Sequence, residues 1–417
     1  MSLMSSVTAK LMFMVVVLSI SSSALAKSTP NVFGGPATAG DLIISEFRLR
    51  GSNGADDEFI EIYNNSGAAH TVADSGAGIG YAIVASDGVT RCVIPNNTVI
   101  PNRGFYLCVN SNAYSLSSYA AGDATYTIDI PDNAGIAVFN TSVAANFTFA
   151  NRLDAAGSTS ETNTLYKEGA GYPALTPFAS DFSFVRDECG KQGSISTMGA
   201  CPSGGNYVDT NNNSTDFFFV DTNGTSLGAG QRLGAPGPQE LASPIQRNAQ
   251  FSMLVLDSTI NSSITPNRVR DFTSDPANNS TFGTIDFRRR VVNNTGASVT
   301  KLRFRVVDIT TFPAPAGIAD VRARTSSLIA VSGINDSATC LASTSSATTP
   351  CTVNVQGTTL EQPPSQVFGG GFNSSLAAGT ITLGAPLANG ASVNVRLLLG
   401  VEKNGTFKFF VSIEALP

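Results

Sequence analysis

The stretch KLRFRV at residues 301–306 shows most clearly which kind of fold the chain adopts. Every second residue in it is apolar, which is the two-residue period of a β-strand and not the 3.6-residue period of a helix. One face of the strand would carry Leu302, Phe304 and Val306, and the other Lys301, Arg303 and Arg305. The pattern therefore predicts an antiparallel strand with an apolar side on a core and a basic side in water.

The same alternation recurs outward from this strand, in short stretches separated by Gly, Asn, Asp, Ser and Pro. The best helix candidate, residues 111–119, is at most a short turn. Near the end, two apolar stretches flank Asn404-Gly405. Asn-Gly between two strands predicts a hairpin, because both residues accept positive φ. We therefore expect an all-β chain of two immunoglobulin-like antiparallel β-sandwich domains.

A proline- and glycine-rich stretch divides the chain. Residues 233–244 hold three prolines and two glycines. Proline cannot donate to the hydrogen-bond ladder inside a sheet, so we expect an exposed connector here. The predicted organisation is a first domain at 39–232, a linker at 233–248 and a second domain at 249–417.

The first 26 residues have the features of an export signal. Lys10 precedes the apolar run 11–20, and residues 24–26, Ala-Leu-Ala, have the small-x-small pattern that signal peptidase recognises. A run of about ten apolar residues is shorter than the roughly twenty that span a bilayer. We therefore expect a cleaved signal peptide at residues 1–26 and no transmembrane segment in the mature chain. We expect a bacterial protein that is secreted or located at the cell surface.

Charge and cysteine content narrow the classes of partner. The chain has a net charge of −6 and only 13% charged residues, so we expect no nucleic-acid partner.

Six cysteines in an exported chain indicate disulfides, and their spacing favours local pairs. The predicted disulfides are Cys92–Cys108, across an antiparallel strand pair, Cys189–Cys201 and Cys340–Cys351.

Several segments of the first half resemble the lamin-tail domain, an immunoglobulin-like β-sandwich known from nuclear lamins and found in many exported bacterial proteins. The resemblance covers roughly residues 39–170, and Tyr81 takes the place of a Trp that the family often carries. It implies a module for contact with other macromolecules and carries no catalytic residues over. The matching segments are DLIISEF at 41–47, the acidic Gly-rich loop 51–57, EFIEIYNN at 58–65, GFYL at 104–107 and NRLDAAG at 151–157.

The densest group of carboxylates lies within that region. Paired carboxylates can perform acid–base catalysis or hold a metal ion. Acids in the loops and at the strand edges of a sandwich are more often solvated, and we expect that here. The group consists of Glu46, Asp56, Asp57, Glu58 and Glu61.

The loop DTNNNSTD at 209–216 has oxygen donors at alternate positions, as calcium-binding loops do. It lacks the Gly and Glu that an EF-hand requires. One interpretation is a calcium site formed by Asp209, Asn211, Asn213 and Asp216. The other, which we favour, is a turn before the strand 217–220 whose side chains bond to the backbone.

Other catalytic signatures are missing from the sequence. His70 is the only histidine, which excludes multi-histidine zinc chemistry, and we expect it in a surface turn. The run Arg288-Arg289-Arg290 is expected to be a solvated strand edge.

These observations favour a non-catalytic binding or scaffolding protein whose partner is a protein or a carbohydrate. Two alternatives remain open: a calcium-dependent carbohydrate-binding module, and a metal-dependent secreted hydrolase or its accessory subunit. The sequence indicates no cofactor other than calcium at the loop 209–216.

Overall fold

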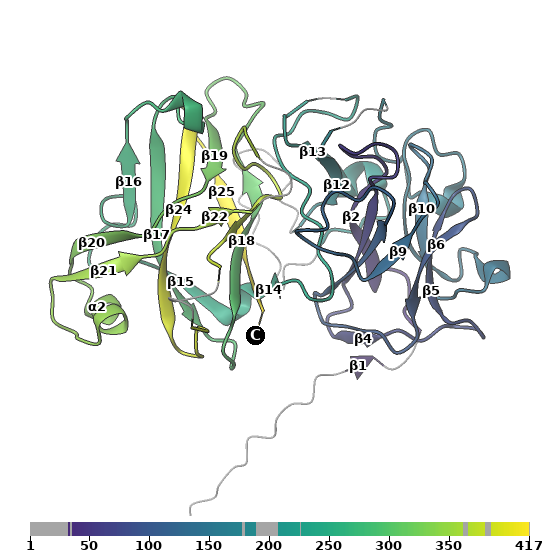
Figure 1. The fold of residues 1–417 in the computed structure, drawn as a ribbon, viewed down its shortest axis with the longest axis horizontal. Helices are drawn as coiled ribbons and strands as arrows, with labels where there is room; N and C mark the ends of the chain where they lie inside the picture. Colours follow the sequence, from purple (N-terminus) through teal and green to yellow (C-terminus); the bar gives the residue numbers. More distant parts are fainter. Residues whose placement is uncertain are drawn as a thin grey trace, which may run out of the picture. The chain divides into compact units, whose positions relative to one another are not determined.

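The computed structural model describes residues 32–33, 36–176, 180–188, 207–225, 227–361, 366–379 and 385–416. All their secondary-structure elements belong to one compact unit, Val32–Pro417. Strands predominate, and the all-β prediction is confirmed (Figure 1). The predicted signal peptide and the pair Cys189–Cys201 lie outside the described residues.

The first sandwich packs a six-stranded sheet against a four-stranded one (Figure 1). Its core lies between them, where Ile44 and Ile62 of one sheet meet Ile83 and Val138 of the other. A small sheet of β1 (Val32–Phe33), β4 (Ala69–Thr71) and β7 (Val99–Ile100) is separate. The six-stranded order is β13 (Phe217–Asp221), β12 (Phe182–Arg186), β2 (Leu42–Arg48), β3 (Phe59–Asn64), β8 (Phe105–Asn110) and β9 (Ala124–Tyr126), and the four-stranded order is β11 (Arg152–Ala156), β10 (Ile136–Phe139), β5 (Gly80–Ala85) and β6 (Thr90–Pro95).

The second sandwich has its own core, which includes Phe304, Val321 and Leu399. One sheet contains β14 (Ile245–Gln246), β25 (Phe409–Leu416), β18 (Lys301–Ile309), β23 (Ser375–Ala377) and β22 (Thr359–Leu360). The other contains β15 (Phe251–Val255), β17 (Thr284–Asn293), β24 (Ser392–Lys403) and β19 (Asp320–Arg324), with β16 (Arg268–Asp271) also paired to β17. The two cores coincide with the predicted halves, and their independence as folding domains stays a prediction.

Short helices occur at places where the sequence pattern does not predict them. Residues 111–119 form turns and no helix, whereas α2 spans Ser337–Thr344. The Asp336 side chain accepts the Thr339 N–H and caps α2. The remaining helical pieces are α1 (Asn213–Asp216) and the 3₁₀ turns η1 (Ala144–Asn146), η2 (Thr164–Tyr166), η3 (Asn248–Gln250) and η4 (Pro276–Asn278).

Two of the predicted disulfides are present. Cys340 of α2 is bonded to Cys351, which begins β21 (Cys351–Val355), the partner of β20 (Ile329–Ile334). Cys92 is bonded to Cys108 with a Cα–Cα distance of 6.3 Å. The expected pairing of their strands is wrong, because β6 belongs to the four-stranded sheet and β8 to the six-stranded one. This disulfide therefore connects the two sheets across the core.

The predicted Asn404-Gly405 hairpin is also wrong. The strand before it, β24, and the strand after it, β25, lie in opposite sheets of the second sandwich. Beyond the turn, the Thr406 carbonyl accepts the Ala319 N–H, so the chain continues along the segment before β19 and not back along β24. A turn that accepts positive φ can serve either connection, and the surrounding packing decides between them.

The KLRFRV segment lies in β18, and only half of its prediction is right. Leu302, Phe304 and Val306 are buried in the core as expected. Arg303 and Arg305 on the other face are 5% and 2% exposed and not in water. They lie against Glu414 of β25: Arg303 Nε is 2.5 Å and Arg305 Nε 2.7 Å from its two carboxylate oxygens.

Acids of the first sandwich complete this buried network. Glu46 Oε2 accepts Asn373 Nδ2 at 3.0 Å, and Arg305 Nη1 donates to Asn373 Oδ1 at 2.9 Å. Glu46 and Glu61 were expected to be solvated and are instead buried. Burial raises the pKa of both carboxyls, and that of Glu61 is raised further by Glu46.

The Pro/Gly linker is buried in the same network, which corrects its predicted exposure. The Gly237 N–H donates to Glu46 Oε1 at 2.9 Å, and the Gln239 N–H donates to Glu61 Oε2 at 2.5 Å. Beside it, Phe372 packs on Val185, Phe218 and Val220 of the first sandwich. The prolines of the linker have no backbone N–H to donate, but the other linker residues do. The N–H groups of Gly237 and Gln239 satisfy these two carboxylates.

Replacing Arg305 with Met should lower the free energy of unfolding by about 3–5 kcal/mol, because Glu414 and Asn373 lose a buried partner. Urea unfolding measures this loss. The control is Arg50→Met, since Arg50 and Asp132 form a pair with both side chains 26% exposed, for which we expect at most about 1 kcal/mol. Equal losses in both variants would show that the buried network does not hold the sandwiches together.

Candidate cation centre

Asp154 lies where the two sheets of the first sandwich meet. Its Oδ2 atom accepts the Ile44 N–H of β2 at 2.7 Å, and its Oδ1 atom accepts the Ala155 N–H at 2.8 Å. The side chain is fully buried. A carboxylate on β11 therefore supplies an acceptor to a strand of the opposite sheet.

Arg186 of β12 is the counter-ion at this junction. Its guanidinium is fully buried, lies 4.5 Å from the ring centroid of Phe217 and donates to the Ile44 carbonyl at 2.7 Å. The nearest carboxylate oxygens lie at 2.6 Å in Asp154, 3.3 Å in Asp209 and 3.4 Å in Asp216. One arginine thus ties β11 and β12 to the loop before β13.

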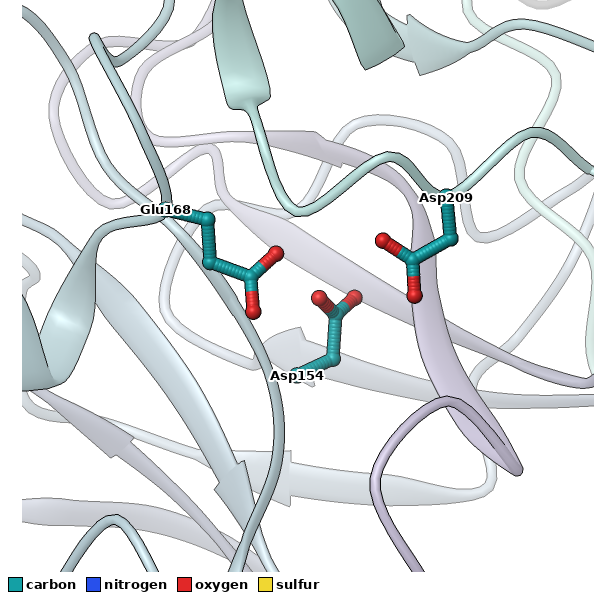
Figure 2. Close-up of side chains that lie close together, drawn as sticks. All are labelled: Asp154, Glu168 and Asp209. Atoms are coloured by element: carbon teal, nitrogen blue, oxygen red, sulfur yellow. The ribbon is translucent and has the colours of Figure 1, made fainter.

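Three carboxylates converge beside this arginine (Figure 2). Asp154, Glu168 and Asp209 each place one oxygen within 4.8 Å of the other two. Glu168 is paired through Oε1 with Arg152 at 2.9 Å, and its Oε2 atom is buried without a hydrogen-bond donor within the described residues. Asp209 is the most exposed of the three, with 15% of its side chain accessible.

The charges at this cluster do not balance. Four carboxylates, those of the three converging residues and Asp216, face the guanidiniums of Arg152 and Arg186. Burial, and then the neighbouring Asp154, raise the pKa of Glu168 to about 9. A proton on Glu168 relieves the excess negative charge, and a divalent cation on the three oxygens would do the same.

The four residues predicted to bind calcium do not form one site. Asn213 Oδ1 accepts the N–H groups of Gly157 and Glu168, each at 2.9 Å. Asp216 accepts the Thr210 N–H at 3.0 Å and faces Arg186, while Asn211 is exposed. The alternative interpretation as a side-chain-bonded turn describes this loop correctly. Only Asp209 belongs to the carboxylate cluster.

Of the other acids in the group predicted at 46–61, Asp57 and Glu58 are buried, whereas Asp56 is partly exposed. Asp57 pairs with Arg48, and both side chains are fully buried. Glu58 accepts Asn110 Nδ2 at 2.9 Å and the Ile130 N–H at 2.8 Å. Burial raises its pKa to about 8. These carboxylates satisfy donors inside the fold, which corrects their expected place in solvent.

His70 also differs from its prediction. It is 1% exposed in β4, with Nε2 at 3.2 Å from the Tyr81 hydroxyl, and does not lie in a surface turn. Burial lowers its pKa. Among the described residues, His70 belongs to no group of three or more potential metal ligands.

Nothing in the sequence predicts that Asp154 and Glu168 lie close to Asp209. The three lie on β11, after η2 and in the loop before α1, and no motif links them. One hint was the single acid within the β11 segment RLDAA, because an acid between buried apolar residues needs buried donors.

The pKa of Glu168 predicts a pH-dependent stability. Its folded value of about 9 exceeds the unfolded value of about 4.5, so the bound proton stabilises the fold below pH 4.5 and this contribution is lost as the pH rises through 9. Glu168→Gln, which keeps a neutral side chain, should therefore lose less stability than the wild type between these limits, as measured by urea unfolding. Glu402→Gln, at a half-buried acid outside the cluster, is the control and should keep the wild-type profile.

Calcium added at pH 9 should raise the stability of the wild type and not that of Glu168→Gln, because only the wild type offers three carboxylates.

For the pH prediction, identical pH profiles of the wild type and Glu168→Gln would contradict the assignment of the bound proton to Glu168.

None of the helices in the described ranges has the length and hydropathy that a membrane-spanning helix requires. Comparisons of the chain with protein-family models, curated proteins and solved structures give no match. The resemblance to the lamin-tail domain therefore gains no support from them and stays a prediction.

Proposed function

We propose that the protein is an exported, non-catalytic binding or scaffolding protein of the bacterial cell surface or extracellular space. The observation that carries the proposal is the use made of the clustered acids. Buried hydrogen bonds and ion pairs within the fold engage the carboxylates of Glu46, Glu61 and Asp57. Acids held in this way connect strands and are not presented to a substrate.

Two further acids with raised pKa values are also held inside the fold. Burial raises the pKa of Glu188 to about 7 and that of Glu58 to about 8. Glu188 accepts Gln246 Nε2 at 2.9 Å and the Ser412 hydroxyl at 3.0 Å. Neither lines the cleft of about 560 Å³ beside β18, whose wall includes Tyr119, Arg303 and Glu361. That cleft is of a size that binds ligands.

The disulfides support the exported location. Cys92–Cys108 and Cys340–Cys351 are both formed in the structure. Disulfides persist in oxidising compartments and are rare in the cytosol. Together with the signal-like segment at residues 1–26, they favour a site of action outside the cytoplasm.

A calcium-dependent carbohydrate-binding module is the second candidate, favoured by the cluster of Asp154, Glu168 and Asp209. Calorimetry with calcium first and sugars second separates the two candidates. Sugar binding that requires calcium and is lost in Asp209→Asn would favour the second candidate.

The mature protein should bind saturably to the envelope of its own cells and hydrolyse none of its components. The experiment is co-sedimentation of purified protein with isolated envelope, together with assays for peptide, glycosidic, ester and phosphodiester cleavage. A hydrolytic activity that co-purifies with the protein and disappears in Glu58→Gln or Glu61→Gln, with the fold retained by circular dichroism, would overturn the proposal.

A further inference from the structure

The arginine run 288–290 lies in the interior of a sheet and not at a solvated edge. Its strand, β17, pairs with β15 and β16 on one side and β24 on the other. Successive side chains on a strand point to opposite faces. Arg288 thus reaches Asp286, with 3.0 Å between Nε and Oδ2, while Arg289 shares the opposite face with Ile285, which is part of the core.

Two arginines of the edge strand β16 share the face of Arg289. Arg268 lies opposite Phe287, and Arg270 lies opposite Ile285, in the antiparallel register. Their face is the apolar one that turns toward the core of the second sandwich. Asp271, the nearest acid in sequence, points to the other face.

These three arginines make no ion pair among the described residues. Their side-chain hydrogen bonds go to backbone carbonyls. Arg268 Nε donates to Ser263 at 2.9 Å; Arg270 donates through Nη1 to Asp271 and to Thr284 at 3.1 Å, and through Nη2 to Phe282 at 2.5 Å; Arg289 Nη1 donates to Asn267 at 3.0 Å and to Arg288 at 2.8 Å. Within the same residues, the two terminal nitrogens of Arg268 donate to no acceptor. Guanidinium donors therefore remain for a ligand.

A pocket of about 230 Å³ opens at this edge of the sandwich. Arg268 and Arg270 line it together with apolar residues, which include Ile285, Val321 and Phe407, and with Asn404. At its border, the guanidinium of Arg270 lies 4.3 Å from the ring centroid of Phe272, a side chain that is 78% exposed. The pocket thus combines cationic donors, an apolar floor and the aromatic ring of Phe407.

The electrostatics of the pocket favour a negative ligand. Burial and the like charge of Arg268 lower the pKa of Arg289. Burial also lowers the pKa of Arg270, and Asp271 only partly offsets this. A protein with a net charge of −6 therefore holds a group of basic side chains without carboxylate partners, and a bound anion would stabilise them.

We propose that this pocket binds an acidic sugar residue, with Arg268 and Arg270 holding its carboxylate. A guanidinium presents parallel N–H donors that match the two oxygens of a carboxylate. A volume of about 230 Å³ lies below the roughly 300–1,000 Å³ of pockets that enclose drug-sized ligands, so it suits one ring of a longer glycan. Phe407 offers an apolar surface for the ring and Asn404 an amide for its hydroxyls.

This inference rests on the proposed binding role, because it names a ligand for that role. The test is titration calorimetry of the full mature protein with galacturonate tetramers, alongside the neutral tetramer cellotetraose. The acidic tetramer should bind with an affinity that falls as NaCl is raised, and cellotetraose should not bind. The double variant Arg268→Gln, Arg270→Gln should bind at least about ten-fold more weakly, as expected for the loss of charge-assisted hydrogen bonds.

Arg288→Gln is the control, since it removes an arginine from the opposite face of the sheet while Arg396 still pairs with Asp286 at 3.1 Å. It should bind like the wild type. The inference is overturned by no binding of galacturonates, by equal binding of cellotetraose or by an unchanged affinity in the double variant. Binding of poly-glutamate or of phosphatidylglycerol vesicles in place of galacturonates overturns it too. Each of these results would refute the proposed ligand but not the proposed binding role, because another surface could still bind a partner. Cleavage of the tetramer, in contrast, would refute only the proposal that the protein is non-catalytic.

Discussion

The structure depends most on the buried pairing of Arg303 and Arg305 with Glu414. A buried charge is costly unless partners surround it, so each arginine requires acceptors from whatever packs on its sheet. Asn373 supplies one acceptor and connects Arg305 to Glu46 of the first sandwich. The linker backbone satisfies the remaining carboxylate oxygens. A Pro/Gly segment that would otherwise be an exposed connector is thereby held in place.

The same arrangement recurs inside the first sandwich. Arg186 is surrounded by carboxylates from β11 and the loop before β13, and Arg48 is paired with Asp57. In each case a fully buried guanidinium fixes a loop against a sheet where apolar packing alone would leave backbone groups unsatisfied. The carboxylates near Arg186 exceed the local cations. Burial, and then the neighbouring Asp154, raise the pKa of Glu168, and one of its oxygens has no donor among the described residues.

The sequence predicted the strands well because alternation is a local property. The apolar face of residues 301–306 and the two local disulfides followed from spacing within a few residues or one loop. Which side chains pack on the outer face of a strand depends on residues far away in the sequence. Glu414, for example, pairs with Arg303, and Asp209 pairs with Arg186. His70 and Glu58 were misplaced for this reason: single-sequence patterns report that a side chain is polar, not whether distant donors allow it to be buried.

This contrast gives the arginines of β16 and β17 their meaning. Where Arg48, Arg186 and Arg305 are buried, the chain supplies a carboxylate for each of them. Arg268 and Arg289 share one face of the sheet, Arg268 lines the pocket at its edge, and no carboxylate of the described residues pairs with either arginine. Their mutual repulsion opposes folding unless water or an anion screens it. The fully buried Arg48, Arg186 and Arg305 each have a carboxylate of the chain, and at the half-buried pair of Arg268 and Arg289 a ligand from outside would supply the missing charge.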